Sequence, residues 1–316
     1  MGMKRLVSTV ELEKDDWLRY RKKGITGTDA GAIVGLNPYK SSFAVYQDKI
    51  SEEIEDFDNE AMRQGRDFEE YVAKRFEEET GFKVRRANAI FQNEEHPVML
   101  ADFDRLISGL PMGRRAGLEC KTVSPYSSDK WENDNIPLQY QMQVQHYLAV
   151  SGFDCWYIAA LIFGKQFIIR KIERDEEIIS NLITIEERFW NENVMKQVMP
   201  DPDGTDDYSD AILKMYASAD RDKAVALFGF NSILERREEI DKLMKKMEQE
   251  KAAIDQKIKL EMKDASYGLT EDYKVSWTTY NQTRFDSKRF KEEQPDLYSH
   301  YEKTNSMRRF TVSHAA

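Results

Sequence analysis

The sequence predicts an α+β protein in which a mixed central sheet flanked by helices is followed by a C-terminal appendage. Two observations lead to this fold class. Residues 1–200 alternate helix-type apolar periodicity with short β-rich runs, whereas one long helical run with a seven-residue apolar repeat lies beyond residue 210. The 316 residues correspond to about two average domains, and 41% hydrophobic and 33% charged residues are typical of a globular chain.

The first fifty residues predict two helices separated by a glycine-rich turn. The first helix ends at the sequence RKKG, the turn spans residues 24–35, and the second helix follows Asn37-Pro38. Thr26, Thr28 and Asp29 in this segment are residue types that cap helix N-termini.

Residues 59–80 predict a strong amphipathic helix that ends at Gly81. Its apolar face is formed by Met62, Phe68, Val72 and Phe76. From residue 82 to 122 the pattern changes to three short strands, VRRANAIFQ, VMLADFDRLI and AGLECKTV, and the turn LPMGRR joins the last two. A helix over residues 137–150, the strands CWYIAALIF and QFIIRKIE, and a helix near residues 175–198 complete this part.

The acidic, turn-rich stretch DPDGTDDYSD predicts a linker at residues 201–210, between a domain at 1–200 and an appendage at 211–316. In the appendage, residues 231–264 predict a long solvated helix with one apolar seam. The seam consists of Ile233, Ile240, Met244, Met247, Ile254 and Ile258, and it is interrupted by Arg237 and Lys251. The interruptions favour a helical hairpin or a partner contact over a long coiled coil. The tail predicts short strands at YKVSWTTYN and RRFTVS around a helix at residues 287–301.

The net charge of −10 argues against a protein whose whole surface binds nucleic acid, although it leaves room for a local basic groove. It also fits a carboxylate-rich site for divalent metal. The longest apolar stretch, at residues 156–163, is far shorter than the ~20 residues that span a bilayer, and the acidic start is no secretory signal. Two cysteines cannot build a disulfide framework. We therefore expect a reduced, cytoplasmic protein without a membrane partner.

The triplet Glu119-Cys120-Lys121 is the main candidate for chemistry. In a strand, Glu119 and Lys121 project from one face while Cys120 points into the core, and Asp104 lies 15 residues before Glu119. If the two strands pair antiparallel around the LPMGRR turn, the two carboxylates converge. They could then hold Mg²⁺, with the backbone carbonyl of Cys120 as a further ligand, while Lys121 orients water and offsets charge on a phosphorane. An ExK triplet with a nearby acid is also common by chance in a chain with 57 acidic residues.

Further motifs surround this triplet in a particular order. They are Trp17-xxx-Arg21, GITGTD at residues 24–29, LNPY at 36–39, GRDFE at 65–69 and QMQVQ at 141–145. Over about residues 15–200, this order resembles the lambda-exonuclease-like, or YqaJ-type, viral recombination nucleases of the PD-(D/E)xK superfamily. The resemblance implies a restriction-endonuclease-like core.

The resemblance implies a role for each matching residue. Asp104 and Glu119 would be metal ligands, Lys121 the catalytic lysine, Glu69 a support for the second metal, and Gln143 a glutamine lining the active site. Arg21 and Thr28 would contact the 5′ phosphate, and Met62 would wedge between terminal bases. The cofactor would be Mg²⁺, with two ions in the site and Mn²⁺ able to substitute.

Several alternatives stay open on the sequence alone. By composition alone, Glu70 is as good a candidate for the site as Glu69. Gln145 faces another side of its helix from Gln143, so at most one of the two would reach the site. Arg21 belongs to a basic cluster that could be a solvated face, and His146 fits a structural role better than that of a general base. Asp102 departs from the small polar residue often found at its position, and a carboxylate there would repel a phosphate.

The implied function is a Mg²⁺-dependent 5′→3′ exonuclease that resects linear double-stranded DNA ends to 3′ single-stranded tails for phage-type homologous recombination. Implied partners are DNA ends, a single-strand annealing protein, and further copies of the chain in a trimeric ring. A phage or prophage origin and the cytoplasm of a bacterial host follow from the same resemblance. The alternatives are a structure- or sequence-specific endonuclease of the same superfamily, and a non-catalytic recombination adaptor.

Overall fold

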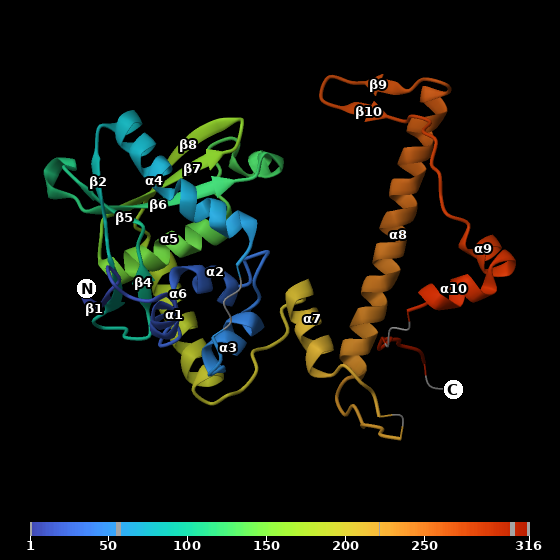
Figure 1. The fold of residues 1–316 in the computed structure, drawn as a ribbon, viewed down its shortest axis with the longest axis horizontal. Helices are drawn as coiled ribbons and strands as arrows, with labels where there is room; N and C mark the ends of the chain where they lie inside the picture. Colours follow the sequence, from blue (N-terminus) through green and yellow to red (C-terminus); the bar gives the residue numbers. More distant parts are fainter. Residues whose placement is uncertain (1, 55–57, 221, 304–306, 315–316) are drawn as a thin grey trace. The chain divides into compact units, whose positions relative to one another are not determined.

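The computed structural model describes residues 2–54, 58–220, 222–303 and 307–314 (Figure 1). The chain forms two compact units, Met1–Tyr216 and Ala217–Ala316. The first unit contains the predicted mixed sheet, and the second contains the predicted long helix. In the described residues, none of the helices has the length and apolar character needed to cross a membrane.

The central sheet of the first unit has five strands in the order β2-β5-β6-β7-β8. They are β2 (Lys83–Arg86), β5 (Arg105–Ser108), β6 (Ala116–Val123), β7 (Cys155–Ile162) and β8 (Gln166–Glu173). β6 and β7 are parallel, because a crossover through η2 (Pro125–Trp131) and α5 (Leu138–Ser151) joins them, and all other pairs are antiparallel. The predicted mixed sheet is therefore confirmed.

Two helices cover the two faces of this sheet, α4 (Glu60–Thr80) on one and α5 on the other (Figure 1). On the α4 face, Phe76 packs in one cluster with Leu118 and Ala159. On the α5 face, Leu148 packs in another cluster with Trp156. Successive residues of β6 and β7 thus alternate between two cores, which fixes the face from which each polar side chain of β6 projects.

A second sheet joins β1 (Met3–Ser8), β3 (Ala89–Asn93) and β4 (Leu100–Asp102). The strand predicted as VRRANAIFQ is therefore two strands in different sheets, because Asn88 adopts a left-handed φ of 52° between them. The strand predicted as VMLADFDRLI is also split, into β4 and β5. This second break lies at residues 103–104 and leaves Asp104 between the two sheets. The short helix η1 (Pro111–Gly113) lies in the predicted turn before β6.

Three helices, not two, follow β1: α1 (Lys14–Arg21), α2 (Gly27–Ile33) and α3 (Ser42–Ile50). The prediction of a turn over residues 24–35 is thus wrong for its central part. Thr26 is the N-cap of α2, and its backbone N–H and hydroxyl donate to Asp29 Oδ2 at 3.0 and 2.8 Å. A Cβ on Gly27 would lie 2.4 Å from the Tyr147 ring, so this glycine serves close packing of α2 on α5.

The first unit ends with α6 (Glu176–Arg188), the π-helix η3 (Phe189–Val194) and α7 (Asp206–Met215). The structure contradicts the predicted linker at residues 201–210. Tyr208 is only 3% exposed with its ring 4.9 Å from that of Phe43, and Asp207 Oδ2 accepts hydrogen bonds from the backbone and hydroxyl of Ser41 at 2.8 and 2.6 Å. The boundary lies after Tyr216, because these contacts anchor α7 to α3.

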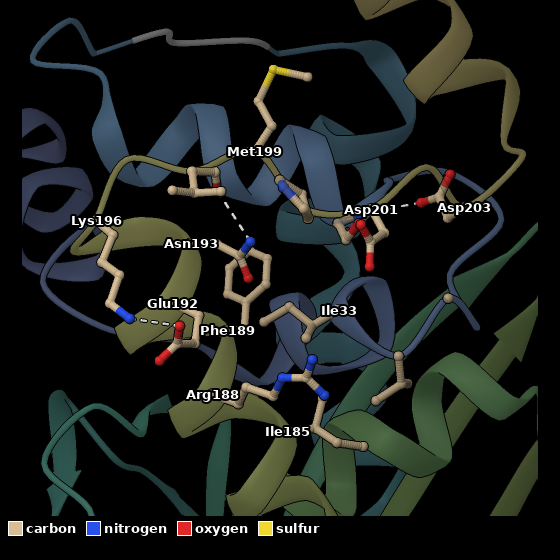
Figure 2. Close-up of a pocket in the computed structure, with 15 residues that line it drawn as sticks. Ile33, Ile185, Arg188, Phe189, Glu192, Asn193, Lys196, Met199, Asp201 and Asp203 are labelled. Atoms are coloured by element: carbon tan, nitrogen blue, oxygen red, sulfur yellow. Dashed lines mark hydrogen bonds and ion pairs between the residues drawn. The ribbon is translucent and has the colours of Figure 1, made fainter. Parts of the chain in front are cut away.

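The segment before α7 borders a hollow of about 620 Å³ (Figure 2). Ile33, Phe189 and Met199 contribute apolar side chains to its lining, and Asn193 Nδ2 donates to the carbonyl oxygen of Val198 at 3.0 Å. None of the predicted site residues lines this hollow.

The second unit contains α8 (Asn231–Met262), the hairpin of β9 (Tyr267–Leu269) and β10 (Lys274–Ser276), α9 (Ser287–Glu293) and α10 (Pro295–Tyr301). The long solvated helix is confirmed, because within α8, all of whose residues are described, Met262 alone is buried. The single helix predicted at residues 287–301 is broken at Pro295, which cannot donate a backbone hydrogen bond. No strand forms at residues 308–313, although they belong to the described part of the tail.

Candidate active site

The predicted antiparallel pairing of β5 and β6 is confirmed, with Arg105 opposite Leu118. This register places Asp104, which directly precedes β5, beside Cys120. Asp104 Oδ2 accepts a hydrogen bond from the backbone N–H of Cys120 at 2.7 Å. The hairpin therefore brings Asp104 to the strand position next to Glu119.

Glu119, Lys121 and Gln143 form one hydrogen-bonded cluster on the α5 face of the sheet. Lys121 Nζ donates to Glu119 Oε1 at 2.6 Å and to Gln143 Oε1 at 3.2 Å. Gln143 Nε2 donates to the same Glu119 oxygen at 2.7 Å and to the Tyr147 hydroxyl at 2.8 Å. Glu119 Oε2 is buried and finds no hydrogen-bond partner among the described residues. One oxygen of Glu119 is thus fixed and the other is left for a ligand.

The charges at this cluster favour a bound cation. Burial raises the pKa of the Asp104 carboxyl well above its usual value, and the nearby charges of Glu119 and Glu69 raise it further. Burial lowers the pKa of Lys121, but Glu119, Tyr140 and Asp104 outweigh this effect, so that its pKa is raised above 10.5 and the ammonium form persists. Ionising Asp104 beside Glu119 is therefore costly even with Lys121 nearby, and a bound cation would relieve that cost.

Asp104 and Glu119 fit a divalent cation, because the unpartnered Glu119 Oε2 and the mutual repulsion of the carboxylates would both be relieved by it. In the described ranges no three His, Cys, Asp or Glu side chains group as a metal centre. Main-chain oxygen, water or phosphate would have to complete the coordination. The Cys120 thiol packs against the α4-side core, as predicted, so its backbone carbonyl is the candidate main-chain ligand.

Glu69 reaches the edge of the site from α4, but its direct partner is Arg105. Arg105 is 3% exposed. Its guanidinium donates to Glu69, to Glu70 Oε2 at 3.0 Å and to the Asp104 carbonyl oxygen at 2.9 Å. Both glutamates are thus tied to one buried cation. Our sequence reasoning missed Arg105, although a basic residue at the start of the apolar run RLI was a usable signal.

Arg21 lies in a second polar cluster and not on a solvated face. Its Nη2 lies 3.2 Å from the hydroxyls of Thr26 and Thr28, and its guanidinium stacks over the Trp17 ring at 4.5 Å. Asp102 Oδ2 accepts from Trp17 Nε1 at 2.6 Å and lies 3.6 Å from Arg21 Nη1. Asp102 therefore holds the stacked Trp17–Arg21 pair in place.

A buried ion cluster anchors the helix that carries Thr28. Asp29 lies 2.8 Å from Lys49 Nζ and 2.9 Å from Lys40 Nζ, and Lys49 also donates to the Arg21 carbonyl oxygen at 3.0 Å. Burial raises the pKa of Asp29, but the two lysines and Arg21 outweigh it, so the pKa is well below its usual value. Sequence reasoning gave Asp29 only the role of a helix cap.

The remaining sequence candidates lie outside these clusters. Met62 is in the first turn of α4 and 47% exposed. Gln145 faces away from Gln143, as predicted, and its Nε2 donates to the Glu173 carbonyl oxygen at 2.9 Å. His146 is fully buried with its Nδ1 2.9 Å from Glu186, which is the structural role predicted for it.

Three comparisons bear on the family. A model described as the YqaJ-like viral recombinase domain matches residues 16–154. The uncharacterized protein YqaJ of Bacillus subtilis (strain 168) is 37% identical over 313 residues, which cover 97% of this chain and 96% of that protein. The crystal structure of LHK-Exo in complex with dAMP has a TM-score of 0.50 and 17% identity, over 65% of this chain and 98% of that chain. Another crystal structure of this alkaline exonuclease, from Laribacter hongkongensis, has a TM-score of 0.49 and 18% identity, with the same coverage.

The likeness to LHK-Exo shows a shared fold, in agreement with the predicted core of a mixed sheet between helices. The sequence match to YqaJ covers nearly the whole chain, including the second unit. The chain therefore belongs to the family of the YqaJ-like viral recombinase domain.

Proposed function

We propose that the protein is a Mg²⁺-dependent 5′→3′ exonuclease acting on the ends of linear double-stranded DNA. The observation that carries the proposal is the cluster of Asp104, Glu119 and Lys121, in which a buried carboxylate oxygen has no hydrogen-bond partner in the described part of the chain and a protonated lysine stands beside it. The family and the fold shared with an alkaline exonuclease support a nuclease on this site.

Each residue of the cluster has a distinct task in the proposed hydrolysis. Bound divalent metal would act as a Lewis acid on the phosphate and on the attacking water. Gln143 holds Glu119 Oε1, which would leave Oε2 to bind the cation. The Lys121 ammonium offers positive charge where the phosphorane develops negative charge, which lowers the barrier more than it tightens substrate binding.

The 5′→3′ polarity is proposed from Arg21 and Thr28. A guanidinium that is stacked on Trp17 and held by Asp102 loses little side-chain freedom when it binds, and it offers paired donors to a terminal phosphate. The carboxylate of Asp102 lowers the net charge of this cluster, so a phosphate would meet Arg21 partly neutralised. The products would be 3′ single-stranded tails.

Digestion of end-labelled linear duplex tests the function directly. We expect release of label with Mg²⁺ or Mn²⁺, none with EDTA, and no nicking of closed circular DNA. Cleavage of the closed circle would favour the endonuclease alternative, and absence of cleavage under all conditions would favour the adaptor.

The proposed assembly and partner rest on the family resemblance. A homo-oligomeric ring around DNA and a single-strand annealing protein stay predictions, which mass measurement in solution and pull-down test respectively. A ring would allow positive potential to gather in its channel while the total charge of each chain is −10.

A further inference from the structure

One stretch of the second unit combines exposed aromatic rings with positive charge. We call residues 273–291 the aromatic–basic segment. It contains five aromatic residues, Tyr273, Trp277, Tyr280, Phe285 and Phe290, and five basic residues, Lys274, Arg284, Lys288, Arg289 and Lys291. Its one acidic residue is Asp286, so its formal charge is +4 in a chain whose total is −10.

Most of these rings are in contact with solvent. Tyr273 is 73% exposed, Trp277 46%, Tyr280 77% and Phe285 73%. Aromatic side chains contribute most to stability when buried, so four exposed rings in 13 consecutive residues indicate a binding surface. Arg289 and Lys291 pair with Glu293 and Glu302, so the positive charge offered among the rings comes from Lys274, Arg284 and Lys288. Together these cations and the rings suit a ligand with both flat apolar groups and negative charge.

The segment is held at both ends. The backbone N–H of Trp277 donates to the Ser266 carbonyl oxygen at 2.9 Å, which extends the β9–β10 hairpin. Asp286 Oδ1 accepts from the Arg289 backbone N–H at 2.9 Å and caps α9. Residues 277–286 between these anchors form neither helix nor strand and are all exposed. The carboxylate of Asp286 is thus committed to the helix. Tyr280 is exposed to a ligand, and Arg284 is also exposed although its Nε donates to Gln282 Oε1 at 2.9 Å.

We propose that the aromatic–basic segment binds single-stranded DNA. Unpaired bases stack on exposed aromatic rings without regard to sequence, and lysine and arginine contact the phosphates between them. A duplex offers no unstacked bases, so it gains only the electrostatic part of this binding. The proposal goes beyond cleavage, since it adds a binding site for the class of strand that the proposed nuclease would leave uncovered.

Binding by the full-length protein tests the proposal with cleavage silenced by EDTA. The probe is a fluorescein-labelled oligothymidylate of about 30 nucleotides, compared by anisotropy with a duplex of the same length. Trp277→Ala and Tyr280→Ala should each weaken binding of the single strand by at least about 5-fold and leave duplex binding unchanged. The matched control is Phe228→Ala, a ring that is 91% exposed in the same unit but outside the segment, and it should bind like the parent.

The charge contribution is measured by salt dependence. Arg284→Gln with Lys288→Gln should reduce the slope of log K against log salt by about 1.4, at ~0.7 for each lost phosphate contact. Lys257→Gln with Lys259→Gln, two changes on α8, should leave the slope unchanged. The proposal is overturned if Trp277→Ala and Tyr280→Ala bind the single strand like Phe228→Ala, or if they weaken duplex binding equally.

These readouts separate the inference from the proposed nuclease. Because no cleavage is measured, a protein without nuclease activity would still show the loss in Tyr280→Ala. Conversely, an active nuclease whose single-strand binding ignores all these changes would retain the proposed function and refute the inference. A variant that retains the far-ultraviolet circular dichroism of the parent excludes misfolding, and Tyr280, at 77% exposed, is the safer of the two positions.

Discussion

Asp104 and Cys120 are joined by a hydrogen bond of 2.7 Å from the backbone N–H of Cys120 to the Asp104 carboxylate. This bond ties one candidate metal ligand to the strand that carries the other, because Glu119 is the neighbour of Cys120 in β6. The backbone of the β5–β6 pair thus positions Asp104 beside Glu119, while the side chains of Lys121 and Gln143 hold the Glu119 carboxylate. Two acidic groups held in this way are costly to ionise together without a cation, in agreement with the raised pKa of Asp104.

That arrangement predicts a trade between stability and activity at Asp104. Asp104→Asn retains an oxygen for the Cys120 N–H but removes a buried negative charge that repels Glu119 and Glu69. We expect the metal-free variant to be more stable by ~1–2 kcal/mol and inactive in cleavage. Thermal unfolding in EDTA and in Mg²⁺ measures this, and the variant should lose the rise in Tm that Mg²⁺ gives the parent.

Alanine at either carboxylate should likewise abolish cleavage while the fold persists. Ca²⁺ should support DNA binding but little turnover, because its looser coordination positions water poorly. Normal digestion by Asp104→Ala or Glu119→Ala would contradict the site assignment.

Lys121→Ala should reduce the cleavage rate by about 10³-fold with little loss of DNA binding, as expected for a charge that acts on the transition state. Lys121→Arg should not restore the rate, because a planar guanidinium cannot take the place of an ammonium between Glu119 and Gln143. Single-turnover rates and binding in Ca²⁺ measure both effects. Lys74→Ala, on the exposed side of α4, is the control. If binding fell as much as rate, Lys121 would be a phosphate anchor.

Local sequence patterns were enough to predict that Asp104, Glu119 and Lys121 lie together. The surroundings of Arg21 depend on contacts between residues far apart in the sequence, which local patterns do not reveal. Strand alternation and one hairpin suffice to bring Asp104, Glu119 and Lys121 together, and both are readable within 18 residues. The contact of Trp17 with Asp102 spans 85 positions, so the carboxylate expected to repel a phosphate could not be recognised as the group that holds Trp17 and Arg21. The glycine-rich segment was misread for a similar reason.

Two glycines there lie against α5, where Gly27 meets Tyr147 and Gly31 meets Gln139. Glycine usually indicates a turn in sequence reasoning. Here close helix packing requires it, and that need is visible only once α2 and α5 are adjacent. The linker was misread because an acidic run also suits a helix N-terminus, as Asp206 and Asp207 show in the first turn of α7.

A 5′-phosphorylated duplex should be degraded faster than its 5′-hydroxyl counterpart, and Arg21→Ala should shrink that difference. Asp102→Asn removes the charge that partly neutralises Arg21, but it also removes the carboxylate that holds Arg21 and Trp17 in place; we expect the loss of position to outweigh the gain of charge, so this change should shrink the difference as well. Initial rates on the two substrates give the ratio. Arg19→Ala, whose side chain is 61% exposed and paired with Asp16, should leave the ratio unchanged. Equal rates on both substrates with the parent protein would refute the phosphate assignment.

His146 should make stability depend on pH. Its Nδ1 lies 2.9 Å from Glu186 and its Nε2 lies 2.8 Å from the Leu100 carbonyl oxygen, so an imidazolium would find an acceptor at each nitrogen. Burial lowers the pKa of His146, but Glu186 outweighs it and the pKa is raised. This stabilisation is complete below the unfolded pKa of ~6.5 and is lost as pH rises through the raised folded value.

The free energy of unfolding should therefore fall above pH ~6.5, by at most about 1.4 kcal/mol per pH unit from this group. Urea unfolding across this range measures the slope. His146→Gln should be less stable than the parent at low pH, and its free energy of unfolding should not decline above pH ~6.5. His300 is exposed in the second unit, so the free energy of unfolding of His300→Gln should change with pH as in the parent. An unchanged slope in His146→Gln would show that the imidazole is neutral in the folded protein.

Truncation separates the two units, and the place of the cut decides the outcome. A chain that ends at Tyr216 keeps α7, whereas one that ends at residue 205 loses Tyr208, whose hydroxyl also donates to the Pro200 carbonyl oxygen at 2.8 Å. Removing this buried ring should cost ~3–5 kcal/mol, so the shorter chain should unfold at lower temperature. The longer one should keep the Tm of the first unit and, under the proposed function, digest linear duplex. Equal Tm values for the two chains would contradict the anchoring of α7.

Pull-down with a single-strand annealing protein then tests whether the second unit is its docking site. If the 1–216 chain still digests linear duplex but no longer pulls down the annealing protein, docking on the second unit is supported. If the 1–216 chain still pulls it down, docking there is refuted.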